Sequence, residues 1–193
     1  MSRDNLAQKL FSISLSLFRK DFFGLYHGSL SAKTESNRFL INKKEAIFDA
    51  LDERSLVELS YKQDYRWQEA SVDAPLHHAI YSQILDAKFV SFTIPPFITA
   101  YSLKHNIIEP KDYFGSTSLG TIEIVDPKSF DDWYERAITE IPHYFLSKHK
   151  DIMVIRGYGV FAYNMDLYEM VKKIAILERS VRLMVIDSSS FQT

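Results

Sequence analysis

The residues best suited to chemistry in this sequence lie between Ser71 and Tyr81. This stretch is typical of a turn that holds Ser71 and the carboxylate of Asp73, followed by a short helix over residues 73–84 that carries His77. A helix that delivers an acidic side chain beside the end of a buried strand is a common way for α/β proteins to build a site. Asp73 is therefore the carboxylate that this segment would place in a site.

A buried strand is predicted directly after this helix, over residues 88–94, and it ends before Pro95 and Pro96. A metal site at such a strand end would need imidazole or carboxylate ligands. The sequence offers Phe92 and Ile94 there instead. The segment thus has the frame of an active site without the ligands of a metal.

Two other arrangements of the same residue types would also be chemically active. A metal site built from His27, His77 and His78 is unfavourable, because adjacent helical residues point about 100° apart and cannot both bind one ion. A nucleophilic Ser/His/Asp triad is also conceivable, although no nucleophile-elbow pattern supports it. Its members would be Asp73, His27 and either Ser29 or Ser71.

The composition is that of an ordinary folded domain. The 193 residues are 46% hydrophobic and 25% charged, which suits a single domain over residues 1–193 with a full core. The net charge is −2 and the basic residues form no large cluster, so we expect no nucleic-acid partner. Without cysteine the sequence has no disulfide, thiolate ligand or thiol nucleophile. Aromatic residues reach 14%, which indicates a large buried or interface area.

The hydrophobic patterning gives no sign of a membrane protein. No apolar run reaches the roughly 18 residues that a membrane span requires. The first residues form an amphipathic pattern with Asp4 rather than a signal peptide. We therefore expect a cytoplasmic protein without membrane association.

The rest of the chain predicts alternating helices and strands around this segment. Further helices are predicted over residues 4–19, 44–51, 97–105, 129–148 and 166–184. Further strands are predicted over residues 26–33, entered through a loop, and over 38–42 and 120–125. Residues 56–61 are predicted as a strand or a turn, and residues 152–163 as a central strand or a hairpin interrupted at Gly157 and Gly159. Asp4 and Ser129 are the expected N-caps, and Pro142 should kink or break its helix. These elements favour an α/β fold with three α/β/α layers and a central, mainly antiparallel sheet.

Three motifs along the chain carry a resemblance to a known family. They are Gly28-Ser-Leu-Ser-Ala-Lys33, the segment from Ala70 through His77 to Phe92-Thr-Ile-Pro-Pro96, and Val154-Ile-Arg-Gly-Tyr-Gly-Val160. Their order resembles the class II aldolase/adducin N-terminal domain family, in which the motifs read G-N-x-S-x-R, then S-S-E…H with H-T-H-P-P, then N-H-G. The resemblance covers residues 6–185 and implies the family's α/β/α fold.

The family's enzymes are zinc-dependent aldolases, epimerases and dehydratases acting on small sugar phosphates, with three histidines as zinc ligands. Carried over motif by motif, those histidines fall on Phe92, Ile94 and Tyr158. Phenylalanine and isoleucine donate no electron pair, and a lone tyrosine oxygen does not hold zinc. The resemblance therefore implies no metal cofactor here, and we expect aromatic side chains to fill the volume of the metal and the sugar.

Other site positions of the family are kept in part. Its catalytic glutamate falls on Asp73, for which a helix N-cap is the alternative interpretation. The phosphate-binding positions implied by the resemblance are Gly28, Ser29, Ser31, Lys33 and Ser71. Lys43 and Lys44 either add positive charge near an anion or form a solvated turn.

The sequence supports two hypotheses about function. In the first, the chain has lost the metal-binding histidines and is a non-catalytic or repurposed binding scaffold. By family analogy it would be a homo-oligomer, a tetramer, with a small anionic or sugar-phosphate ligand. In the second, it is a metal-independent sugar-phosphate lyase of the aldolase, epimerase or dehydratase type. Asp73 would then be the general base, and Lys33 would stabilise the enediolate.

Overall fold

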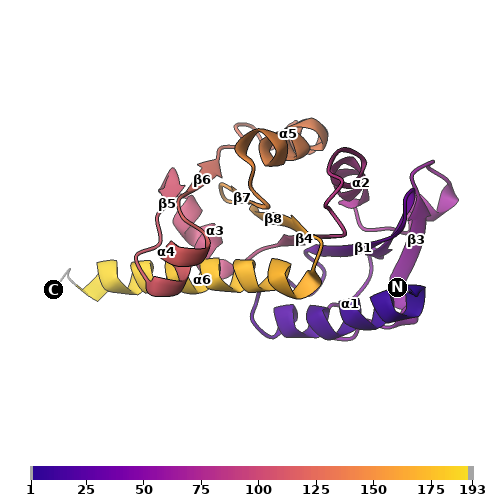
Figure 1. Cartoon of the computed structure of the whole chain (residues 1–193), viewed down its shortest axis with the longest axis horizontal. Coiled ribbons are helices and arrows are strands. Elements are labelled where there is room, and N and C mark those ends of the chain that lie inside the picture. Colours follow the sequence, from indigo (N-terminus) through magenta and orange to yellow (C-terminus); the bar gives the residue numbers. More distant parts are fainter. Residues whose placement is uncertain (1, 191–193) are drawn as a thin grey trace.

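The computed structural model describes residues 2–190 and contains one mixed sheet (Figure 1). The strands are β1 (Ser29–Glu35), β2 (Arg38–Asn42), β3 (Leu56–Ser60), β4 (Phe89–Thr93), β5 (Ile107–Ile108), β6 (Ile122–Val125), β7 (Ile152–Ile155) and β8 (Gly159–Asn164). Their order across the sheet is β3-β2-β1-β4-β8-β7-β6-β5. Neighbouring strands are antiparallel except β6 and β7, which are parallel. The predicted, mainly antiparallel sheet is confirmed.

Helices cover both faces of the sheet. They are α1 (Arg3–Phe18), α2 (Ala74–Gln83), α3 (Pro96–Ser102), α4 (Tyr113–Ser118), α5 (Trp133–Lys148) and α6 (Leu167–Ser190). Short 3₁₀ turns, η1 (Glu53–Ser55) and η2 (Tyr65–Gln68), flank β3. Helices α1 and α6 lie on one face, and α2 and α5 lie on the other (Figure 1). This arrangement is the predicted three-layer architecture.

The strands divide their side chains between two hydrophobic cores. In β2, Leu40 belongs to the core beneath α1 and α6, whereas Phe39 and Ile41 belong to the core beneath α2 and α5. In β7, Val154 and Met153 separate in the same way. Successive residues of a strand point to opposite faces, so a sheet that is covered twice needs apolar residues at both parities.

The predicted helix over residues 44–51 is wrong, because this segment forms turns. Its buried residues are Ala46 and Phe48, two positions apart, which is not a helical spacing. The carbonyl of Phe48 accepts a hydrogen bond from Ser14 Oγ at 2.6 Å and ties the segment to α1. Strand β5 and helix α4 were not predicted, because both are too short to show a periodic pattern.

Two predicted helix starts and one predicted break also need correction. Ser2 rather than Asp4 caps α1, by accepting a hydrogen bond from the Asn5 N–H at 3.4 Å. Helix α5 begins at Trp133, four residues beyond the predicted cap, and it continues through Pro142 without interruption. The predicted break did not occur, although a proline inside a helix leaves one carbonyl without its donor.

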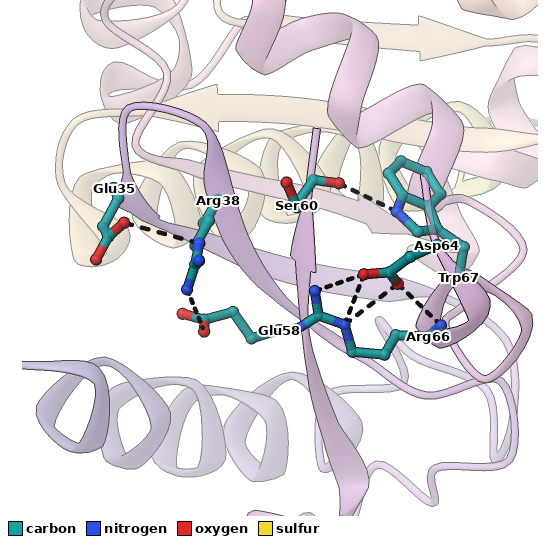
Figure 2. Close-up of polar contacts among 7 residues, drawn as sticks. All are labelled: Glu35, Arg38, Glu58, Ser60, Asp64, Arg66 and Trp67. Carbon is teal, nitrogen blue, oxygen red and sulfur yellow. Dashed lines mark hydrogen bonds and ion pairs between the residues drawn. The ribbon is translucent and has the colours of Figure 1, made fainter. Parts of the chain in front are cut away.

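Polar contacts tie η2 to the edge of the sheet (Figure 2). The indole N–H of Trp67 donates to the Ser60 carbonyl at 3.1 Å. Both carboxylate oxygens of Asp64 accept hydrogen bonds from the Arg66 guanidinium, at 2.6 to 3.2 Å. The first contact holds η2 against the end of β3, and the second stabilises the turn that begins η2.

Within residues 2–190, none of the helices has the length and hydrophobicity needed to cross a membrane.

Candidate functional site

A pocket of about 310 Å³ lies at the end of β4. Five parts of the chain form it: the residues before β1, the end of β2, the turn before α2, the end of β4, and the turn between β7 and β8. Its polar lining residues are Asn42, Lys44, Ser71 and Asp73. Its apolar and aromatic lining residues are Val72, Phe92, Ile94 and Tyr158, and Tyr26, His27 and Gly28 complete it. The fold therefore brings together residues from all three sequence motifs.

Stacked aromatic rings form one wall of this pocket. The Phe92 ring lies 4.9 Å from the Tyr158 ring and 4.8 Å from the Phe161 ring, between centroids. Tyr158 in turn lies near Phe130 and Trp133. Phe92 is only 6% exposed, so it serves the core as well as the pocket. Phe92 and Tyr158 line the pocket without filling it, so an accessible volume remains where aromatic filling was expected.

Two glycines allow the backbone to approach this wall closely. Gly159 has φ of +150°, and a Cβ there would lie 2.5 Å from the Thr93 carbonyl oxygen and 2.7 Å from the Phe92 ring. Gly28 has φ of +121°, and a Cβ there would lie 2.4 Å from the Phe23 ring. Both positions require a residue without a side chain.

Asp73 does not cap α2, although it occupies the N-cap position. Its Oδ2 instead accepts a hydrogen bond from Ser29 Oγ at 2.7 Å. The side chain is nearly buried, at 4% exposure, and burial raises the pKa of Asp73 to about 6 against the opposing effect of the Ser29 donor. The predicted N-cap position is thus confirmed but the capping hydrogen bond is absent, and the carboxylate is held towards β1 with a pKa raised by burial.

A chain of buried hydroxyls and one imidazole continues from this contact. Ser29 Oγ lies 2.8 Å from His77 Nε2, and Ser31 Oγ lies 2.6 Å from His77 Nδ1. Ser31 Oγ also lies 2.7 Å from the Tyr81 hydroxyl. Burial lowers the pKa of His77 to about 3, so its ring is neutral at pH 7. This network was not predicted from the sequence, because the two serines and the helix lie in separate motifs more than forty residues apart.

The predicted phosphate-binding residues end up in three different places. Gly28 and Ser71 line the pocket. Ser29 and Ser31 lie beneath it, fully buried, and their hydroxyls are occupied by the network. Lys33 lies at the other end of β1, where its Nζ donates to the Tyr81 carbonyl at 3.4 Å and lines a separate cavity. The structure does not bring Lys33 to Asp73, because Lys33 lies four residues along β1 from Ser29, the partner of Asp73, which is roughly 13 Å of strand.

Lys44 is the cation that the pocket does contain. Its neighbour Lys43 forms an ion pair with Glu69 at 2.9 Å and faces another cavity. Among the described residues, Lys44 has no acidic side-chain partner and lines the pocket with Asn42. It can therefore offer its charge to an anion.

The alternative sites considered from the sequence are not formed. His27 is exposed and does not contact Asp73, so the proposed nucleophilic triad is absent from the described residues. His78 packs its ring edge-on against Tyr61 and Trp67, away from His77. Across the part of the chain that the structure describes, no three His, Asp or Glu side chains are arranged to hold a metal ion.

The donor chemistry of the pocket does not fit the family's zinc ion. Phe92 and Ile94 lie at the strand end with Tyr158 opposite, and the first two have no donor atom. The Tyr158 hydroxyl keeps its proton, because burial and the negative charge of Asp73 both raise its pKa. Zinc prefers imidazole, thiolate or carboxylate ligands, and the lining residues supply only one carboxylate, Asp73, and one imidazole, His27, which is too few to hold the ion.

Tyr134, at the start of α5, was not predicted as a site residue. Its hydroxyl is buried and has no hydrogen-bond partner among the described residues. Burial raises its pKa, and the charges of Asp73 and Tyr158 add to this effect, which places Tyr134 near both. A single tyrosine in an amphipathic helix gives no sequence signal for such a role.

A larger cavity, about 750 Å³, lies elsewhere, between α1, α3 and α6. Its buried acidic residue, Glu178, accepts hydrogen bonds from the N–H groups of Phe97 and Ile98, each at 2.9 Å. That carboxylate serves the start of α3 and is not available for chemistry. The pocket at β4 is therefore the better candidate site.

Comparisons with known proteins agree with the fold. The L-fuculose-1-phosphate aldolase from Thermus thermophilus matches with a TM-score of 0.88 and 21% identity, covering 100% of both chains. YgbL from Escherichia coli, a putative aldolase/epimerase/decarboxylase, matches with a TM-score of 0.81 and 18% identity, covering 94% of this chain and 89% of that one. The sugar-phosphate aldolase from Thermotoga maritima matches with a TM-score of 0.74 and 12% identity, covering 98% and 97%.

These identities establish the fold alone, and no curated protein matches the chain. The sequence itself carries the family relationship. The sequence model described as "Class II Aldolase and Adducin N-terminal domain" matches residues 8–185, nearly the whole chain. The chain therefore belongs to the class II aldolase and adducin N-terminal domain family.

Proposed function

We propose that this chain is a metal-independent member of its family that binds a small anionic ligand, such as a sugar phosphate, in the pocket at β4. The observation that carries the proposal is the stack of Phe92 between Tyr158 and Phe161 at the strand end. A metal ligand at this point would need an electron pair directed into the pocket, and an aromatic wall offers none. The pocket nevertheless keeps a usable volume, a carboxylate and a cation.

Metal content is the direct test of this proposal. The protein, purified without chelators from zinc-supplemented cells, should contain far less than one zinc per chain by plasma mass spectrometry. A Phe92→His, Ile94→His, Tyr158→His variant is the matched control, because it restores three imidazoles at these positions. One firmly bound zinc per wild-type chain would overturn the proposal.

Ligand binding tests the second half of the proposal. Sugar phosphates should raise the melting temperature, and the matching unphosphorylated sugars should not, because Lys44 and Ser71 recognise the anionic group. The stabilisation should fall in Ser71→Ala and persist in Lys33→Ala, since Lys33 lies outside the pocket. Equal stabilisation by both sugar series would contradict an anion-binding site.

A second function is favoured by the position and pKa of Asp73. A metal-free lyase or isomerase would use its carboxylate to remove a proton from the carbon beside a carbonyl. The electron pair would then move to the carbonyl oxygen, and the Tyr158 hydroxyl or the Lys44 ammonium would stabilise that oxygen. Exchange of the substrate proton in deuterated water, lost in Asp73→Asn, would support this function.

The proposed assembly is a homo-oligomer. Four large apolar side chains between residues 103 and 114 are exposed, namely Leu103, Ile107, Tyr113 and Phe114. Clusters of exposed apolar residues commonly mark protein interfaces, and the rings of Tyr113 and Phe114 lie 5.4 Å apart. Light scattering should give a mass above that of one chain, and Phe114→Ser should shift it towards the monomer. A monomeric wild-type protein would rule out this part of the proposal.

A further inference from the structure

The hydrogen bonds beneath the pocket can be assigned a direction, because each group has a single proton to give. Ser29 donates its hydroxyl proton to Asp73 Oδ2, so it can only accept from His77 Nε2. The neutral His77 ring then carries its proton on Nε2, and Nδ1 accepts from Ser31. Ser31 has used its own proton and accepts from the Tyr81 hydroxyl.

We propose that these five side chains form one relay of hydrogen bonds that all point towards Asp73. In this relay His77, Ser31 and Tyr81 are positioning residues that hold the carboxylate through Ser29. The Tyr81 hydroxyl also lies 3.4 Å from the Lys88 carbonyl, but its 2.7 Å contact with Ser31 Oγ is much the shorter, so Ser31 is the preferred acceptor of its proton. The inference deepens the proposed function, and it rests on Asp73 being the acid–base group of the pocket.

The relay gives the two oxygens of Asp73 different roles: one is held by a hydrogen bond, and the other is left to contact a ligand. Oδ2 is committed to Ser29, whereas Oδ1 accepts no hydrogen bond from the described residues. Since Asp73 lines the pocket, Oδ1 is the oxygen that exchanges a proton with a ligand. A carboxylate with one fixed oxygen also has a fixed plane, so Oδ1 keeps a constant direction.

The surroundings of Asp73 explain why such a relay is needed. Burial disfavours its charge, and two neighbouring hydroxyls do not offset this, because Tyr134 on α5 and Tyr158 in the β7–β8 turn remain neutral. The other titratable groups that line the pocket with it are His27, Lys44 and Tyr26. Aligned hydrogen bonds strengthen one another in a buried site, so the relay favours the ionised carboxylate.

The tautomer of His77 tests the inference in the unaltered protein. Heteronuclear NMR of the imidazole nitrogens at pH 7 should show the His77 proton on Nε2. The His77→Gln variant identifies the signal, because it removes this ring and keeps a donor and an acceptor on the amide. A proton on Nδ1 would overturn the relay, since Ser29 would then have two acceptors and no donor.

The titration of Asp73 tests whether the remote residues act on it. Removing the direct donor in Ser29→Ala should raise the Asp73 pKa by about one to two units, as expected for a hydrogen bond to a charged group. His77→Leu should raise it by about half a unit and Tyr81→Phe by less, because only the cooperative part is lost. His77→Gln should restore the wild-type value. An unchanged Asp73 pKa in a folded His77→Leu would contradict a positioning role.

Both measurements use the protein without ligand, so they separate this inference from the proposed function. An Nε2 proton together with the graded pKa shifts supports the relay even if no sugar phosphate binds. An Nδ1 proton overturns it even if a sugar phosphate binds tightly.

Discussion

The two sides of the pocket at β4 are built on opposite principles. On the side of α2, buried polar groups meet at 2.6 to 2.8 Å in a continuous chain of hydrogen bonds. On the side of the β7–β8 turn, the rings of Phe92, Tyr158 and Phe161 meet at 4.8 to 4.9 Å. The polar side depends on direction and on proton positions, whereas the aromatic side depends on area and close packing.

This difference indicates which side of the pocket could take part in a reaction. The aromatic side adds buried area to the core and supplies no ligand for zinc. The polar side carries a network that stability alone does not require, because well-packed apolar residues of the same volume would avoid the desolvation cost of buried polar groups. We therefore place the chemistry of the pocket on the polar side.

The largest effect is expected on the aromatic side. Phe92→Ala should lower the free energy of unfolding by about 3–5 kcal/mol, because it leaves a cavity between two stacked rings. Urea unfolding measures this, and Ile94→Val at the same wall should cost only about 0.5–1.5 kcal/mol. A loss below about 1 kcal/mol for Phe92→Ala would mean that the wall is not part of the core.

The pH dependence of the free energy of unfolding tests the polar side of the pocket. The raised pKa of Asp73 lets the folded protein bind an extra proton between pH 4 and 6, so its contribution to stability falls as pH rises. The lowered pKa of His77, about 3, acts in the opposite sense, and its contribution rises with pH up to about 6.5. The two contributions nearly cancel between pH 4 and 6.

Asp73→Asn should expose the contribution of His77. The stability of this variant should rise by about 1.4 kcal/mol per pH unit between pH 4 and 6, relative to the wild type. Urea unfolding at several pH values gives the slope. Parallel curves for variant and wild type would show that Asp73 titrates normally in the folded protein.

A smaller loss of stability is expected from the middle of the relay. Ser31→Ala should cost about 1–3 kcal/mol, since it leaves His77 Nδ1 without a donor in a buried site. The exposed Ser12, on α1, is the matched control, and Ser12→Ala should change stability by no more than about 0.5 kcal/mol. Equal effects of the two substitutions would argue against a tightly bonded network.

The smallest effect is expected at the mouth of the pocket. Lys44→Ala should weaken the binding of a sugar phosphate by about two- to fivefold, as expected for an exposed ion pair, and added salt should reduce the difference. Lys33→Ala should leave the affinity unchanged, because Lys33 donates to Tyr81 at the other end of β1. Calorimetric titration compares them. A larger effect from Lys33 would relocate the anion site.

The sequence predicted the layers and most strands, because a sheet covered on both faces needs long apolar runs such as residues 152–155. It also predicted that Asp73, Phe92 and Tyr158 belong together, and the motif order carried that information. Lys33 was expected beside Gly28 and Ser29 because the three residues share one motif, but a strand of this length carries Lys33 away from the pocket. Spacing along the chain does not tell which end of a strand a side chain serves.

The relay could not be predicted for a different reason. Ser29 and Ser31 lie two apart on a strand and so point to one face, and His77 and Tyr81 lie four apart on a helix and do the same. Each half of the pattern is legible in the sequence. Their meeting depends on the packing of α2 over β1, which only the folded structure supplies.

Gly159 gives the aromatic wall a consequence for how this protein can change. Its backbone lies so close to Phe92 and Thr93 that even one methyl group would collide with them. A substitution there would move the start of β8 away from β4 and shift Tyr158 with it. Random mutagenesis for ligand binding should therefore return variants at Val72 and Ile94 but retain glycine at 159. The route by which the pocket can acquire a new ligand runs through its loops and avoids this turn.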